Sequence, residues 1–95
     1  MYKTFILIIH FAVPTPAHLI RKGDALKTAV KPLGRFYPAF VTDRSISLCL
    51  KTDDHAAAIL KHLNQHLLTD ADRVQIFELS EDHALHGFSQ LALWL

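Results

Sequence analysis

The segment Tyr2–Phe11 constrains the fold more than any other feature of the sequence. Its apolar side chains fall on both faces of an extended strand, with Phe5, Leu7, Ile9 and Phe11 on one face and Ile6 and Ile8 on the other. A strand that is apolar on both faces is typical of the covered centre of a sheet. The segment therefore predicts a central strand with both of its faces covered by other parts of the protein.

The remainder of the chain alternates between helical and extended patterns. Thr15 and Pro16 form an N-cap and first-turn pair, which predicts a helix over about Pro16–Lys31. Two extended segments follow and predict a β-hairpin, after which a second apolar stripe has helical spacing. The further expected elements are strands over Arg35–Val41 and Ser45–Lys51, a helix over about Asp53–Leu67, and a strand over Arg73–Ser80.

Three local signals refine this pattern. Pro38 lies inside the first hairpin strand and so predicts an edge strand or a bulge. Thr52 or Asp53 is expected to cap the second helix. The tail predicts a short turn or helix near His83–Gly87, followed by an apolar segment that ends at Trp94 and Leu95.

The predicted order is β-α-β-β-α-β followed by a C-terminal arm. An α+β, ferredoxin-like fold with an antiparallel sheet and both helices on one face is the expected solution. Since the chain has 95 residues, we expect residues 1–95 to form a single domain. At 51% hydrophobic residues, the chain carries more apolar surface than so small a core can bury, which predicts a homodimer.

Composition excludes several classes of protein. The net charge of +1 gives no strong field to attract nucleic acid to the whole surface. The single Cys49 excludes an internal disulfide framework and a cysteine-rich zinc site. The longest apolar run, Phe5–Ile9, is far shorter than the roughly 20 residues that span a bilayer, and no secretory signal is visible. We expect a cytoplasmic protein with no membrane partner and no cofactor.

Several short motifs carry a resemblance to a known family. The motifs are Leu33-Gly34, Ser47–Thr52, Val74–Leu79, Gly87-Phe88 and Trp94-Leu95. With these motifs the chain resembles the small SinR-like proteins, relatives of the CRISPR-associated protein 2 and VapD endoribonuclease-like group. The resemblance implies a ferredoxin-like homodimer whose C-terminal segments pack across the dimer, with Gly87, Phe88 and Trp94 as the expected dimer contacts.

The chain departs from this family at its metal site. The metal-dependent members have an aspartate within a Tyr-Asp pair at the end of the first strand, where this chain reads Ile9-His10-Phe11. Mg²⁺ prefers oxygen ligands, so His10 is a poor substitute and we expect no metal site of the family type. A histidine at a strand end can still act as a general base, which makes His10 the candidate catalytic residue.

Basic residues gather in the first half of the chain and suggest contacts to nucleic-acid phosphates. The candidates are Arg21, Lys22, Lys27, Lys31, Arg35 and Arg44, with Tyr37 as a possible stacking platform for bases. The leading hypothesis is a dimeric module without nuclease activity that binds RNA or DNA weakly or binds a protein partner. The alternatives are a toxin-type endoribonuclease that uses His10, and a purely structural or regulatory interaction module.

The chain has seven histidines. His62 and His66 lie four positions apart on the second predicted helix, a spacing that can bind Zn²⁺ or Ni²⁺. The glutamate of the His-Glu-x-x-His metalloprotease pattern is absent between them. The favoured interpretation is a solvated or interfacial flank of the helix, and no metal site is predicted.

Overall fold

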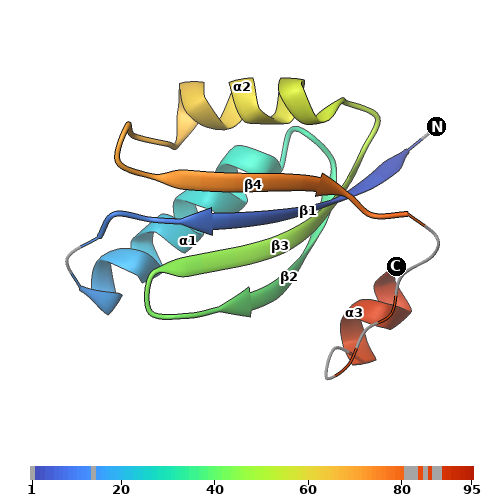
Figure 1. Cartoon of the computed structure of the whole chain (residues 1–95), viewed down its shortest axis with the longest axis horizontal. Helices are drawn as coiled ribbons and strands as arrows, with labels where there is room; N and C mark the ends of the chain where they lie inside the picture. Colours follow the sequence, from blue (N-terminus) through green and yellow to red (C-terminus); the bar gives the residue numbers. More distant parts are fainter. Residues whose placement is uncertain (1, 14, 81–83, 85, 87–88) are drawn as a thin grey trace.

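The computed structural model describes residues 2–13, 15–80, 84, 86 and 89–95. The predicted order β-α-β-β-α-β is confirmed, and a short third helix follows it (Figure 1). Most boundaries fall within one to three residues of the predicted ones. The elements are β1 (Lys3–His10), α1 (Pro16–Val30), β2 (Arg35–Val41), β3 (Ser45–Thr52), α2 (Ala56–His66), β4 (Arg73–Glu78) and α3 (Ser89–Trp94).

The four strands form one antiparallel sheet in the order β2-β3-β1-β4. This order, with two crossover helices, is the ferredoxin-like arrangement. The strand β1 lies between β3 and β4, with Leu7 opposite Leu48 on one side and Ile76 on the other. The prediction of a central first strand is therefore confirmed.

One face of the sheet carries α1 and α2, and the core lies between these layers (Figure 1). Alternate residues of β1 point into it, and Leu7 and Ile9 are completely buried. The helices contribute Leu26 and Val30 from α1 and Ile59 from α2, which are equally inaccessible. We call the opposite side of the sheet the open face, because neither α1 nor α2 covers it.

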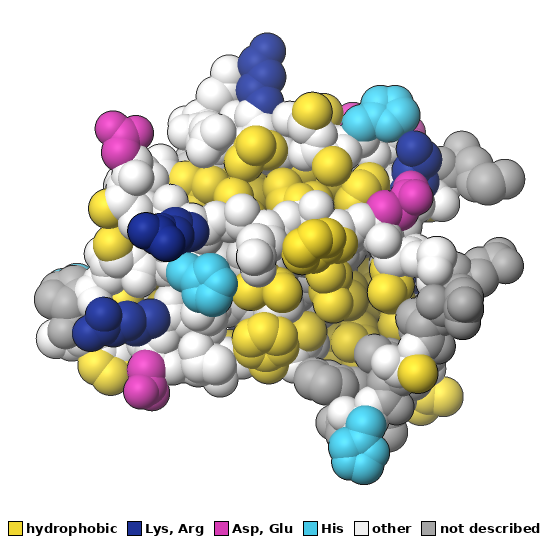
Figure 2. Space-filling view, in the orientation of Figure 1, with side chains coloured by type: hydrophobic (Ala, Val, Ile, Leu, Met, Phe, Trp, Pro, Cys, Tyr) yellow, Lys and Arg dark blue, Asp and Glu magenta, His cyan; other side chains and the backbone are white. Residues whose placement is uncertain are grey.

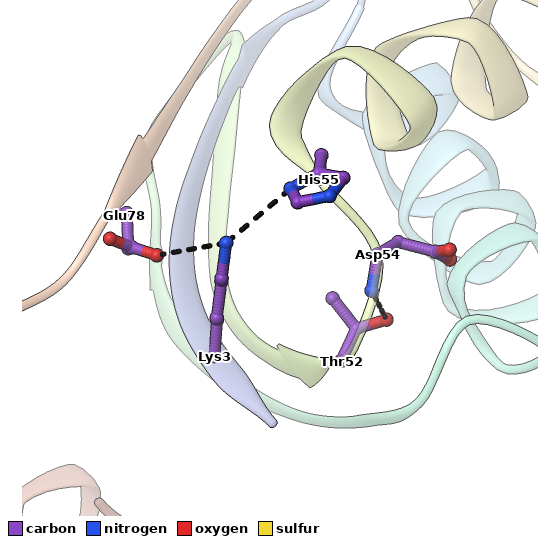
Figure 3. A network of polar contacts seen from close by, with 5 residues as sticks. All are labelled: Lys3, Thr52, Asp54, His55 and Glu78. Carbon is purple, nitrogen blue, oxygen red and sulfur yellow. Dashed lines mark hydrogen bonds and ion pairs between the residues drawn. The ribbon is translucent and has the colours of Figure 1, made fainter. Parts of the chain in front are cut away.

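The two main helices begin differently. Thr15 caps α1, since its side-chain oxygen accepts a 3.4 Å hydrogen bond from the backbone N–H of His18, as predicted. The predicted start of α2 is wrong: the helix begins at Ala56 behind His55, which makes no capping bond with its side chain. The Thr52 hydroxyl instead accepts from the backbone N–H of Asp54 at 3.2 Å, outside the helix (Figure 3).

The hairpin strand β2 lies at the edge of the sheet, as Pro38 predicted. Its pairing with β3 shifts register between Pro38 and Phe40, so a bulge accompanies the proline. Gly34 precedes this strand, and a Cβ atom there would overlap the backbone carbonyl of Lys51. The chain can enter β2 this close to β3 only because residue 34 has no side chain.

The end of the tail forms α3, where the sequence predicted only an apolar segment. The helix packs on β2: the rings of Tyr37 and Trp94 are 5.9 Å apart. Lys51 of β3 donates a 2.6 Å hydrogen bond to the Trp94 carbonyl, and its ammonium lies 4.3 Å from the centre of the indole ring. Tyr37 and Lys51 belong to the open face, so α3 covers part of it.

Among the described residues, no helix is both long enough and apolar enough to cross a membrane.

Candidate nucleic-acid interface

The open face has an apolar centre (Figure 2). Ile6 and Ile8 of β1 point to this side, because their neighbours Leu7 and Ile9 point into the core. Phe77 of β4 lies directly opposite Ile6 and leaves 55% of its surface exposed. The apolar residues on both faces of β1 are thus explained by two packing surfaces, only one of which α1 and α2 cover.

His10 lies at the end of β1 on the edge of this open face, with its side chain exposed. The register places it directly between Ser45 of β3 and Arg73 of β4. Its Nδ1 atom is 2.5 Å from the Ser45 hydroxyl oxygen, and Ser45 itself is buried. This hydrogen bond fixes the orientation of an otherwise exposed ring and leaves Nε2 as the nitrogen available for other contacts.

Basic side chains flank His10. Arg73 is exposed, and residues directly opposite on antiparallel strands have Cβ atoms about 5 Å apart. Arg44 is in the turn before β3, where its backbone carbonyl accepts a 2.8 Å bond from the N–H of Phe11. Figure 2 shows histidine and basic side chains close together at the side of the sheet where β1 ends. We call His10, Arg44, Ser45 and Arg73 the His10 cluster.

The turn before β4, which contains Thr69 and Asp72, connects the end of β1 to the start of β4. The Asp72 carboxylate accepts bonds from the backbone N–H groups of Ala12 at 2.9 Å and Thr69 at 2.8 Å. Partial burial acts to raise the pKa of Asp72, but the hydrogen bonds from Thr69 and Ala12 and the charge of Lys22 outweigh it and lower the pKa. The charged carboxylate therefore holds the exit of β1 beside the start of β4.

Arg73 and Ser45 were not predicted from the sequence as site residues. Both lie at the first position of a strand, and neither belongs to a motif with His10. The signal that could have found them is the register: once β1 is central and antiparallel to both neighbours, the residues that begin β3 and β4 lie beside its last residue.

The cluster contains no carboxylate that faces His10 across the sheet. Among the described residues, no group of three or more His, Cys, Asp or Glu side chains could hold a metal ion. The groups present are an imidazole, a hydroxyl and two guanidinium ions. This set can bind an anion and exchange a proton.

The structure spreads the predicted basic residues over three places. Arg21, Lys22 and Lys27 are on α1, and Lys31 is the residue that follows its last turn, all in the layer behind the sheet. Lys22 lies 5.9 Å from the centre of the Phe11 ring. Arg35 and Tyr37 belong to the open face of β2, but at the end of the hairpin away from Arg44. Tyr37 is half-buried, and the centre of its ring lies 5.9 Å from that of Trp94. Of the predicted set, only Arg44 joins His10.

The predicted dimer contacts fall in the tail. Trp94 is half-buried and makes its described contacts within its own chain, to Tyr37 and Lys51. Gly87 and Phe88 lie outside the described residues, as does most of the predicted turn at His83–Gly87.

Three other histidines occupy helix ends or interfaces. His18 is exposed, and its Nδ1 lies 2.6 Å from the Thr15 hydroxyl at the start of α1. At the far end of the sheet, the Lys3 ammonium lies 3.4 Å from Nδ1 of His55 and 3.8 Å from the carboxylate of Glu78 (Figure 3). These exposed contacts contribute little to stability. His62 bridges α2 to α1 through a 2.6 Å bond to the carbonyl of Ala29.

A hollow of about 230 Å³ lies between α1 and the edge strand β2. Ile20 and Val41 border it and are 70% and 66% exposed. Its remaining lining is mainly apolar, with Asp24 and Lys27 as the charged residues. It has no histidine in its lining, and the Ser47 hydroxyl donates a 2.8 Å hydrogen bond to the Leu7 carbonyl, so we do not place chemistry there.

No family model matches this chain, and no curated protein matches it. Among solved structures, the chain is similar to the crystal structure of the NE2512 protein of unknown function from Nitrosomonas europaea. The likeness has 20% sequence identity and a TM-score of 0.49, and it covers 92% of this chain and 98% of that chain. The class of this protein, α+β with a ferredoxin-like fold, follows from its own strand order and register.

Proposed function

We propose that this protein is a homodimeric ferredoxin-like module that binds nucleic acid weakly and has no metal-dependent nuclease site. The proposal places it with the SinR-like proteins, as the resemblance implies, and in the cytoplasm. The observation that carries it is the position of His10 between Ser45 and Arg73 on the open face.

The chemistry of the His10 cluster fits a phosphate group. A guanidinium ion presents N–H donors in a planar fork that matches two phosphate oxygens, and Arg73 and Arg44 are both exposed. The His10 imidazole adds a donor between them when it is protonated. Two or three phosphate contacts give weak binding that salt reduces, since each contact releases condensed counterions.

The test is binding of labelled single-stranded RNA and DNA, measured by fluorescence anisotropy at low and physiological salt. Arg73→Gln is expected to weaken binding several-fold and to lower the slope of log K against log salt by about 0.7. The matched control is Lys61→Gln, which removes the same charge from an exposed position on α2. Equal losses in both variants would show a non-specific charge effect and contradict the proposed interface.

A second candidate function, a toxin-type endoribonuclease, is favoured by the bond between His10 and Ser45. When Nδ1 donates its proton to the Ser45 hydroxyl oxygen, Nε2 can accept the proton of a ribose 2′-hydroxyl. The 2′-oxygen then attacks the adjacent phosphorus to form a 2′,3′-cyclic phosphate, and the bond to the 5′-oxygen breaks as that oxygen takes a proton from water. Arg73 would stabilise the charge on the phosphate oxygens in the transition state. This reaction needs RNA and no metal, because the nucleophile is the substrate's own hydroxyl.

The two candidates are separated in one assay. RNA and DNA are incubated with and without Mg²⁺ and Mn²⁺, using the wild-type protein and His10→Ala. Cleavage of RNA alone, independent of metal and lost in His10→Ala, would establish the ribonuclease. Binding without cleavage supports the module. Neither binding nor cleavage would contradict both candidates and favour an interaction module whose partner is a protein.

A further inference from the structure

Two histidines of α2 lie together in a groove between α1 and α2. His62 and His66 are one helical turn apart, and the centres of their rings are 4.4 Å apart. The groove has a volume of about 470 Å³. Asp24 and Thr28 of α1 line its other wall. The groove belongs to the helix layer, whereas His10 is on the open face, so it is separate from the proposed nucleic-acid interface.

The orientation of His62 is fixed by α1. Its Nε2 atom lies 2.6 Å from the carbonyl oxygen of Ala29. A carbonyl oxygen can only accept, so Nε2 must carry the proton of this bond. In the neutral imidazole the lone pair is then on Nδ1. Metal-binding histidines usually donate their other N–H to a carbonyl or carboxylate in this way, which fixes the tautomer and increases the basicity of the ligand.

The spacing and the ring contact suit chelation by two imidazoles. Side chains four positions apart lie on the same face of a helix, and the ring centres of His62 and His66 are close enough for one ion to reach both. Imidazole ligands suit Zn²⁺, Ni²⁺ and Cu²⁺, whereas Mg²⁺ prefers oxygen. Asp24 lines the same groove and supplies a negative charge from α1.

We propose that His62 and His66 bind one divalent transition-metal ion of the Zn²⁺ and Ni²⁺ class in the α1–α2 groove. Because no third His, Cys, Asp or Glu converges with them among the described residues, water fills the other positions. The Ala29 carbonyl acts as the outer partner of His62 and connects the metal to α1. Binding therefore strengthens the contact between the two helices.

The test uses ZnCl₂ and NiCl₂ as probes of the full chain, by isothermal titration calorimetry and thermal unfolding. Because His83 and His86 lie three positions apart in the sequence, all proteins carry His83→Gln and His86→Gln to remove a second pair of histidine ligands. We expect one metal per chain and a rise in Tm of several degrees at about a hundredfold excess over Kd, with no rise in MgCl₂. His66→Gln is expected to weaken binding at least about tenfold.

The matched control is His55→Gln, which removes a histidine outside the groove and should leave binding unchanged. His66 is exposed, so its variant is expected to fold, which circular dichroism would check. Unchanged binding in His66→Gln, or an equal loss in His55→Gln, would overturn the proposal. A second readout is the tautomer of His62 by long-range ¹H–¹⁵N NMR: the Nε2–H form supports the site, and the Nδ1–H form contradicts it.

Discussion

The Asp72 carboxylate accepts a hydrogen bond of 2.9 Å from the backbone N–H of Ala12, which lies 60 positions earlier in the chain. The same carboxylate also accepts from the backbone N–H and the hydroxyl of Thr69, at 2.8 and 3.1 Å. One side chain thus joins the exit of β1 to the turn before β4. These are the two strands that carry His10 and Arg73.

Replacing Asp72 with alanine is expected to lower the free energy of unfolding by about 1–3 kcal/mol, because backbone N–H groups lose a charged acceptor. Urea unfolding at pH 7 measures the change. Asp70→Ala is the matched control, since Asp70 is an exposed acid in the same turn. If Asp70→Ala lowered the stability as much as Asp72→Ala, the change in net charge would explain the effect, and the hydrogen bonds of Asp72 to Ala12 and Thr69 would not.

The same carboxylate predicts a pH dependence of stability. The pKa of Asp72 is lowered in the folded protein: burial opposes this, but the bonds from Thr69 and Ala12 and the charge of Lys22 outweigh it. Its contribution is therefore fully present above the unfolded pKa of about 3.9 and is lost as the pH falls through the lower folded pKa. Unfolding measured from pH 6 to pH 2 should show a smaller fall for Asp72→Asn than for the wild type. Parallel curves for the two proteins would contradict this assignment.

Gly34→Ala is expected to destabilise the protein by more than about 2 kcal/mol, because the new Cβ overlaps the Lys51 carbonyl and forces β2 away from β3. Gly23→Ala provides the comparison: its Cβ would lie 3.3 Å from the Cδ1 atom of Ile46, a side chain that can shift. Alanine is favoured over glycine within a helix by about 1 kcal/mol. Thermal unfolding should therefore separate the two variants, and similar Tm values would contradict the close approach at Gly34.

The sequence predicted the sheet and its helices because their signals are local and repeated. The apolar residues on both faces of Tyr2–Phe11 indicated a central strand, and Pro38 indicated an edge strand. The start of α2 was less predictable. Thr52 has a capping side chain, but it is the last residue of β3 and is completely buried, so its hydroxyl bonds to Asp54 in the loop.

The candidate site was only partly predictable. His10 stood out because it ends an apolar strand, but Arg73 and Ser45 become its neighbours only through the register of three strands. The predicted basic residues do not lie on one surface of the chain, because α1 lies behind the sheet and Arg35 is at the opposite end of the hairpin from Arg44. Charge clustered along a sequence need not remain clustered when the chain reverses direction.

Cys49 should report whether α3 stays on the open face. The thiol lies on β3 opposite Tyr37, which contacts Trp94, and its side chain is completely buried. Burial also raises the pKa of the Cys49 thiol, so little reactive thiolate forms at pH 7. We expect slow reaction with Ellman's reagent in the native protein.

Leu91→Asp tests whether α3 protects the Cys49 thiol. Leu91 of α3 is only 3% exposed, so a charge buried at this position would release the helix from the sheet. The rate of Cys49 modification is expected to rise at least about tenfold. Leu93→Asp places the same charge at a position that is 84% exposed and should leave the rate unchanged. An unchanged rate in Leu91→Asp would show that α3 does not protect the thiol.

Phe77 tests the proposed homodimer. It leaves 55% of its surface exposed at the apolar centre of the open face, and apolar area of this kind is typical of interaction surfaces. If two copies pack through their open faces, Phe77→Asp buries a charge against the partner and should weaken the dimer at least about tenfold. Sedimentation equilibrium over a range of protein concentrations measures the dissociation constant. Ile20→Asp is the matched control, since Ile20 is 70% exposed on α1, in the layer behind the sheet. A wild-type protein that stays monomeric at high concentration would contradict the dimer, and loss of the dimer in Ile20→Asp alone would place the interface on the helix layer.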